Sequence, residues 1–128
     1  MGCLPYDTYI AMFQVDTVQV YLTYLFVLNC SLLDAMSAEC AIVANDTSPV
    51  REAITDQETG LLTGFFYHAQ LVKKVGTLQD VSEQSASLGQ NAPAFVKAKY
   101  DLNSICIPNH LGWVGELAQA PLKIFAKT

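Results

Sequence analysis

The chain has 128 residues, enough for one compact domain with a buried core and too few for two. Hydrophobic residues make up 52% of the sequence and charged residues 15%, which excludes an intrinsically disordered chain. The 7 Lys and Arg residues are scattered and are outnumbered by 12 Asp and Glu, so the net charge is −5. Nucleic-acid binding needs a dense cationic surface, and this distribution argues against a nucleic-acid partner.

Four cysteines, at positions 3, 30, 40 and 106, show neither a CxxC pair nor a neighbouring histidine cluster. Zinc sites need ligands in closely spaced pairs, so the sequence predicts no metal site. The first residues do not form a signal peptide, which predicts free thiols in a reducing cytoplasm rather than disulfides. His68 and His110 lie far apart in the sequence, and we expect no catalytic residue among the histidines. Glycine-rich cofactor and phosphate loops are missing too, so no cofactor is predicted.

Residues 17–33 carry no charge, and two interpretations of this run stay open. A membrane-spanning helix would need roughly 20 predominantly apolar residues. Polar side chains such as Gln19 and Asn29 interrupt the run, and no cluster of Lys and Arg flanks it. The alternative is a strand, because apolar and polar residues alternate from Val18 to Thr23. We favour the strand.

Hydrophobic periodicity and turn residues predict short helices alternating with shorter strands. In chain order, we predict a turn at Leu4–Pro5 and a helix to Phe13, a strand at Val18–Thr23, a helix from Cys30 or Ser31 to Ser37 with Asn29 or Ser31 as its cap, a buried strand at Ala41–Ala44, a helix at Val50–Thr55, a strand at Leu61–Thr63, helices at Phe66–Leu78 and Val81–Lys99, and a last helix at Ser104–Ala118. Pro93 predicts a kink or a break in its helix, and Pro108 an interruption in the last one.

This alternation predicts an α/β fold with a parallel sheet. Three strands are few for such a sheet, so the pattern indicates one half of a doubly wound, Rossmann-like domain. Ligands of these sheets bind beyond the carboxyl ends of the strands. We therefore expect the loop after the first strand, residues 24–29, to lie at the functional site.

Two stretches resemble a group of family 4 glycosyltransferases with the GT-B fold. Residues 21–36, YLTYLFVLNCSLLDAM, are similar to the family's YLTYPFVLSWSLLEAM. Residues 37–62, SAECAIVANDTSPVREAITDQETGLL, are similar to its SAGCPVVASDTAPVREVIRDGENGLL. Further along, Phe65-Phe66 resembles the family's DFF, and Tyr100–Leu102 with Cys106–Pro108 resembles its YDL and CLP. The resemblance runs from about Leu4 to Trp113.

The resemblance implies the donor-binding half of a GT-B C-terminal domain. In that family the carboxylate of the LLEAM helix binds the ribose, and the start of the helix with its preceding loop faces the diphosphate and the sugar. By position, Asp34 would bind the ribose; Val27, Leu28 and Asn29 would offer backbone amides, and Ser31 a hydroxyl. Free N–H groups at a helix start favour phosphate on physical grounds as well. Capping is the alternative role for Asn29 and Ser31, and a plain exposed helix position is the alternative for Asp34.

Five departures fall within the best-matched stretch. Leu25 replaces Pro and leaves the loop more conformational freedom, and Asn29 and Cys30 replace Ser and Trp at the helix entry. Asp34 replaces Glu and is one methylene shorter, and a displacement of ~1 Å can cost on the order of a hundredfold in rate. Glu39 replaces Gly at the helix exit, at a cost of roughly 1 kcal/mol if this position needs a left-handed backbone.

We therefore expect residues 1–120 to form a partial glycosyltransferase C-terminal domain and residues 121–128 a disordered tail. The expected ligand of this domain is a UDP- or GDP-linked sugar, and the resemblance implies retaining hexosyl transfer as its reaction class. We expect the protein in the cytoplasm or at the periphery of the inner membrane. We expect no activity from the chain alone, because the family's acceptor domain and diphosphate-neutralising cations would lie upstream. The alternatives are a non-catalytic α/β remnant that associates through an exposed sheet edge, and a small single-span membrane protein.

Overall fold

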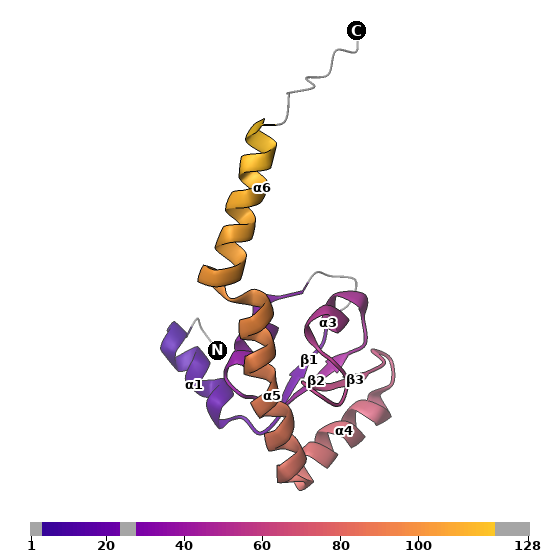
Figure 1. Ribbon diagram of the computed structural model, residues 1–128. Helices are drawn as coiled ribbons and strands as arrows, with labels where there is room; N and C mark the ends of the chain where they lie inside the picture. Colours follow the sequence, from indigo (N-terminus) through magenta and orange to yellow (C-terminus); the bar gives the residue numbers. More distant parts are fainter. Residues whose placement is uncertain (1–3, 24–27, 120–128) are drawn as a thin grey trace. The chain divides into compact units, whose positions relative to one another are not determined.

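The computed structural model describes residues 4–23 and 28–119 (Figure 1). The elements in chain order are α1 (Tyr6–Val15), β1 (Gln19–Tyr21), α2 (Cys30–Ser37), β2 (Ile42–Asn45), α3 (Ser48–Ala53), β3 (Leu61–Thr63), α4 (His68–Asp80), α5 (Ser82–Tyr100), a π-helical turn η1 (Leu102–Cys106) and α6 (Ile107–Gln119). Two compact units are present, residues 1–97 and 98–128. The predicted boundary at residue 120 and the predicted disordered tail at 121–128 lie outside the described residues.

A three-stranded parallel sheet in the order β1-β2-β3 forms the centre of the first unit. Val43 of β2 pairs with Val20 of β1 and with Leu61 of β3, which fixes the register on both sides. All four residues of β2 are buried, as predicted for a strand covered on both faces. The α/β fold with one part of a doubly wound parallel sheet is confirmed.

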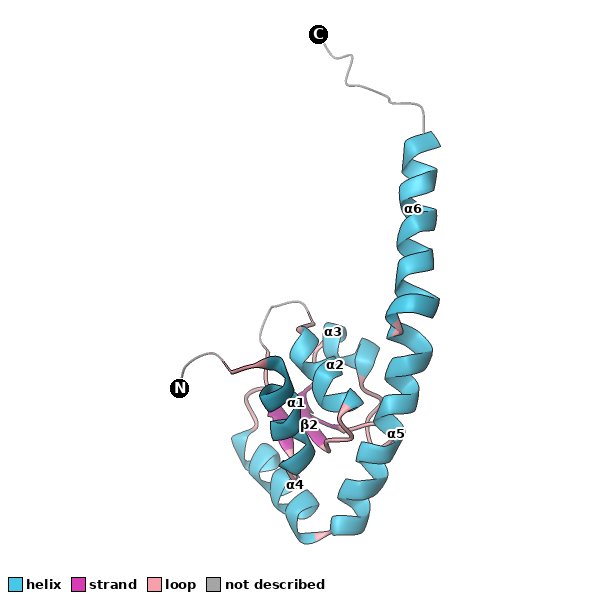
Figure 2. Cartoon of the chain, turned by 90° about the vertical axis from the view of Figure 1, so that its left-hand side faces the viewer, coloured by secondary structure: helices cyan, strands magenta, loops and turns pink. Residues whose placement is uncertain are grey.

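Helices pack on both faces of this sheet. One face contacts α1, α2 and α3, and Figure 2 shows α1 and α2 side by side over it. At the centre of this face Leu32 and Met36 of α2 are fully buried, each worth about 1.5–3 kcal/mol of transfer free energy. The other face contacts α4, whose Leu78 is fully buried, and Leu88 of α5. This packing anchors α2, which has only 8 residues.

The run at residues 17–33 is not one helix. It contains β1, ends in the first residues of α2, and includes residues 24–27, which lie outside the described part. Within residues 4–23 and 28–119, no helix is both long and apolar enough to cross a bilayer. The strand interpretation of the first part of this run is confirmed.

Of the kink or break predicted at Pro93, the break is wrong, because α5 continues from Ser82 to Tyr100 with Pro93 inside it. Ala92 is buried in the core just before the proline, and Phe95 and Val96 pack against the same core just after it. These contacts hold both halves of α5 in helical geometry despite the missing backbone donor.

In the second unit the helical path changes type rather than stopping near Pro108. The carboxylate of Asp101 caps η1 by accepting from the amides of Asn103, at 3.1 Å, and Ser104, at 2.8 Å. From Ile107 the chain continues as the regular helix α6, with Pro108 in its first turn, where a missing N–H is tolerated. The predicted interruption near Pro108 is therefore wrong: η1 passes directly into α6 at Ile107, and the helix continues through Pro108.

Candidate functional site

The carboxyl ends of β1, β2 and β3 lie at one edge of the sheet, because both pairings are parallel. Sheets of this kind bind ligands outside that edge. The entry to α2 follows β1 there, and the short connection to α3 follows β2. We therefore take this edge, with α2 at its centre, as the candidate site.

Helix α2 begins at this edge with Asn29 as its cap, as predicted. The Asn29 side-chain oxygen accepts a hydrogen bond from the amide of Ser31 at 3.3 Å. The backbone amide of Asn29 donates to the hydroxyl of Tyr21, the last residue of β1, at 2.9 Å. The start of α2 is thereby bonded to the end of β1.

Asn45 makes a second connection at the same edge. It is the last residue of β2, and its side chain is completely buried. Its Oδ1 accepts from the backbone amide of Thr23 at 2.8 Å, and its Nδ2 donates to the carbonyl of Thr23. The amide side chain thus continues the pairing of β1 with β2 beyond the last backbone pair, between Tyr21 and Ala44.

Asp34 lies in the middle of α2 and its carboxylate contacts α1. Its Oδ2 accepts a hydrogen bond from the hydroxyl of Tyr9 at 3.3 Å. Burial raises the pKa of Tyr9, and the neighbouring charge of Asp34 raises it further. A groove of about 290 Å³ between α1 and α2 is open to the carboxylate, and is lined by Tyr6, Ile10, Gln14, Asp34, Ser37 and Ala38.

The predicted site residues occupy three kinds of position. Asn29 and Ser31 lie together at the entry of α2, and Asp34 follows on the same helix. Leu28 is half-buried and packs against the core. Val27 lies outside the described residues. Hydrogen bonding already occupies the amides of Asn29 and Ser31.

Sequence reasoning missed three residues that hold the predicted ones in place, namely Tyr9, Tyr21 and Asn45. A polar residue directly after the apolar run at 41–44 was a signal for Asn45, because a buried amide at a strand end needs partners nearby. Tyr9 and Tyr21 gave no such signal, since their partners come from other elements of the fold.

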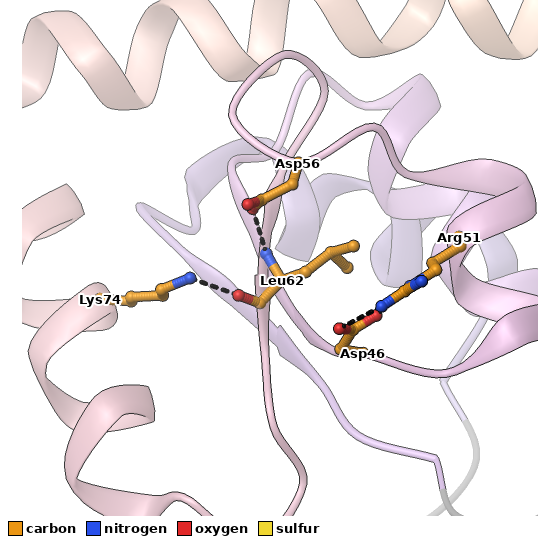
Figure 3. Close-up of polar contacts among 5 residues, drawn as sticks. All are labelled: Asp46, Arg51, Asp56, Leu62 and Lys74. Atoms are coloured by element: carbon orange, nitrogen blue, oxygen red, sulfur yellow. Dashed lines mark hydrogen bonds and ion pairs between the residues drawn. The ribbon is translucent and has the colours of Figure 1, made fainter.

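Directly after β2, Asp46 forms an ion pair with Arg51 across the start of α3 (Figure 3). The Arg51 guanidinium, which donates to both carboxylate oxygens, lowers the pKa of Asp46. Arg51 is a cation close to the sheet edge, and this carboxylate neutralises it.

The outer edge of β3 is closed by side chains (Figure 3). The amide of Leu62 donates to Oδ1 of Asp56 at 2.7 Å, and its carbonyl accepts from the ammonium of Lys74. These are the backbone groups that point away from β2 in this register. Another strand therefore meets occupied groups on this side of the sheet.

Two buried hydroxyls near the candidate site, those of Thr47 and Thr63, have no hydrogen-bond partner within the described residues. Thr63 ends β3 and is 3% exposed. Across residues 4–23 and 28–119, no three His, Cys, Asp or Glu side chains gather in a way that could hold a metal ion.

The exit of α2 has the left-handed backbone that was considered from the sequence. Glu39, which stands where the similar family sequence has Gly, has φ of 63°. Gln57 has φ of 67°, and it too stands opposite a Gly of that sequence. These are the two described residues other than glycine with positive φ. Both strained backbone positions are therefore ones at which the similar family sequence has Gly.

Comparisons with known proteins agree with this architecture. The family of glycosyl transferases group 1 matches residues 5–95. Sucrose-phosphate synthase from Thermosynechococcus elongatus superposes with a TM-score of 0.83 at 17% identity, over 92% of this chain and 30% of that chain. The C-terminal domain of a glycosyl transferase group 1 family protein, LpcC, from Francisella tularensis superposes with a TM-score of 0.69 at 23% identity, over 78% of this chain and 52% of that one. Among curated protein sequences, none matches.

Proposed function

This chain belongs to the glycosyl transferases group 1 family, and we propose that it forms the part of such an enzyme that binds a UDP- or GDP-linked sugar. The observation that carries the proposal is the start of α2 at the carboxyl edge of the sheet, with Asp34 further along the same helix. A helix start attracts phosphate through its partial positive charge, and a carboxylate accepts hydrogen bonds from ribose hydroxyls.

In this proposal the diphosphate lies at the start of α2, near Ser31, and the ribose lies against Asp34. Tyr9 holds the carboxylate from the side of α1, at 3.3 Å. Among the described residues the Tyr9 contact uses Oδ2 of Asp34, which leaves Oδ1 for a ribose hydroxyl. Asp is shorter than the Glu of the similar family sequence, so the ribose must lie closer to α2 than a Glu would require.

We further propose that the chain alone transfers no sugar. It spans 30% of the sucrose-phosphate synthase chain and 52% of the LpcC domain that it resembles. Transfer depends on stabilising the charge that develops on the leaving diphosphate. Arg51 lies near the edge and is paired with Asp46, so it supplies little of that charge stabilisation. Retention of the anomeric configuration is implied by family resemblance.

Titration with UDP and with GDP, followed by NMR or calorimetry, tests donor binding. We expect saturable binding of one of the two nucleotides, weakened about fivefold to tenfold in Asp34→Asn, because the amide accepts the ribose hydrogen bond without the negative charge. Asp80→Asn, at the exposed end of α4, is the matched control and should bind as the wild type does. An absence of saturable binding at millimolar nucleotide contradicts the proposal and favours a non-catalytic remnant.

A second candidate function, association with another copy of this chain, is supported by the difference between the two sheet edges. Asp56 and Lys74 occupy the outward backbone groups of β3, whereas on β1 the Val20 carbonyl accepts only a 3.3 Å bond from the neighbouring Gln19 side chain among the described contacts. Val20 is 39% exposed. We propose that two copies pair their β1 edges, because an edge strand with accessible backbone groups is a template for another strand.

Sedimentation over a range of protein concentrations tests this pairing. We expect a monomer–dimer equilibrium that Val20→Lys shifts to monomer, since a charge on an edge strand opposes strand addition. Val72→Lys on α4, where the valine is 71% exposed, is the control for added charge and should leave the equilibrium unchanged. A monomer at every concentration, or equal effects of the two variants, contradicts the pairing.

A further inference from the structure

Two side chains from inside the sheet bond the chain between β1 and α2: Tyr21 bonds the cap residue of α2, and Asn45 bonds Thr23, two residues after β1. Tyr21, which is 8% exposed, places its hydroxyl 2.9 Å from the amide of Asn29. Asn45, which is completely buried, bonds both the amide and the carbonyl of Thr23. We refer to the side chains of Tyr21 and Asn45 as the clamp. It holds the chain on both sides of residues 24–27, which lie outside the described part.

The clamp bonds the chain just after β1 and at the cap of α2. A buried amide side chain is costly unless it is hydrogen-bonded, and Asn45 meets this requirement only while Thr23 stays in place. The Tyr21 ring is part of the core, so its hydroxyl is a fixed acceptor for Asn29. A helix of 8 residues has little stability of its own. Its first turn therefore depends on contacts of this kind.

We propose that Tyr21 and Asn45 are positioning residues for the nucleotide site, which hold the N-terminal turn of α2 at the carboxyl edge of the sheet. The inference rests on the proposed donor binding, because it gives the clamp a role in affinity. Neither side chain needs to touch the nucleotide. Each acts through a backbone group next to the site, the amide of Asn29 or the peptide groups of Thr23.

A purely structural role is the competing interpretation, and the two differ in what they change. A structural role lowers the unfolding temperature and leaves the affinity of the folded protein unchanged. A positioning role lowers the affinity at temperatures where every variant is folded, because the free protein must order the first turn of α2 when it binds.

The test measures nucleotide affinity and amide hydrogen exchange on the full chain. Tyr21→Phe removes a single oxygen, and Asn45→Ala removes the second half of the clamp. Tyr67→Phe is a control at a tyrosine that is 64% exposed. Asn91→Ala is a control at an asparagine whose side chain also bonds a backbone carbonyl, that of Glu58, at 3.1 Å. UDP and GDP are the probes, well below the unfolding temperature of each variant.

We expect Tyr21→Phe to weaken nucleotide binding about fivefold to tenfold, the effect of one net hydrogen bond, and to speed exchange at the amide of Asn29. Asn45→Ala should speed exchange at Thr23 and weaken binding at least as much. Both controls should bind as the wild type does. Wild-type affinity in Tyr21→Phe and in folded Asn45→Ala overturns the proposal.

The exchange data separate failure of this inference from failure of the proposed function. If the wild type binds neither UDP nor GDP, donor binding is wrong and the positioning role falls with it. The clamp itself is then judged by exchange: protection of Asn29 that is lost in Tyr21→Phe supports the connection of β1 to α2. Equal exchange in the two proteins overturns that connection as well.

Discussion

Replacing Glu39 with glycine should stabilise the protein. Glu39 follows the exit of α2 and has φ of 63°, a conformation that suits glycine. Its backbone is held there by the turn, in which the Cys40 amide donates to the carbonyl of Ala35 at 3.1 Å. The side chain is exposed, so its removal takes little buried surface away.

The expected gain is the difference of two effects. A left-handed conformation costs a residue with a Cβ roughly 1–2 kcal/mol, which glycine avoids. Glycine also makes the unfolded chain more flexible, which costs about 0.4–1 kcal/mol. We therefore expect Glu39→Gly to raise the free energy of unfolding by about 0.5–1 kcal/mol. For a compact unit of residues 1–97 this corresponds to an unfolding temperature higher by about 2–6 °C.

Urea and thermal unfolding followed by circular dichroism measure this gain. Glu39→Ala removes the same carboxylate and keeps the Cβ, so it should leave stability nearly unchanged. Glu83→Gly, in the first turn of α5, has ordinary helical geometry and should lose up to about 1 kcal/mol. If Glu39→Gly is no more stable than Glu39→Ala, the strain argument is refuted and the charge or size of the side chain must account for any change.

Two further predictions concern packing and ionisation. Gly89→Ala should lower the free energy of unfolding by about 2 kcal/mol or more, because its Cβ would lie 2.2 Å from the carbonyl oxygen of Glu39. Gly76→Ala, whose Cβ would meet nothing within 4 Å, should instead stabilise α4 by about 0.5–1 kcal/mol. Urea unfolding measures both changes. Burial raises the pKa of the Cys40 thiol to about 11, so a disulfide reagent at pH 8 should modify exposed Cys30 first; equal rates would contradict this. The unfolded Cys40 thiol ionises from about pH 8.5, whereas the folded thiol stays protonated up to about pH 11. The free energy of unfolding should therefore fall as the pH rises through this range.

The sequence predicted the central sheet well because its strands are marked locally. The third strand was placed at Leu61–Thr63, as observed, since a run of turn residues ending at Gly60 precedes it. The buried strand was placed one residue early, at Ala41–Ala44, and the observed β2 ends at Asn45. A polar residue ended the predicted strand, whereas in the fold Asn45 is still in the sheet because its side chain finds partners on Thr23.

The candidate site was predicted less completely, because its contacts join elements distant in sequence. Asn29 was identified as a cap from its residue type, which is a local property. The bond between Tyr9 and Asp34 depends on how α1 packs on α2, 25 residues apart. The continuity of α5 through Pro93 likewise depends on core contacts that no local rule contains.

Helix α2 is held at both ends by residues outside it, and this determines what a substitution can do to the site. At its start the clamp bonds Asn29 to β1. At its exit the Glu39 carbonyl lies against Gly89 of α5, where even a methyl group would collide. A shift of α2 along its axis must therefore break the bond between Tyr21 and Asn29 or push Glu39 into Gly89. Asp34, between these two ends, can adjust through its side chain, and its partner Tyr9 is the contact that limits that adjustment.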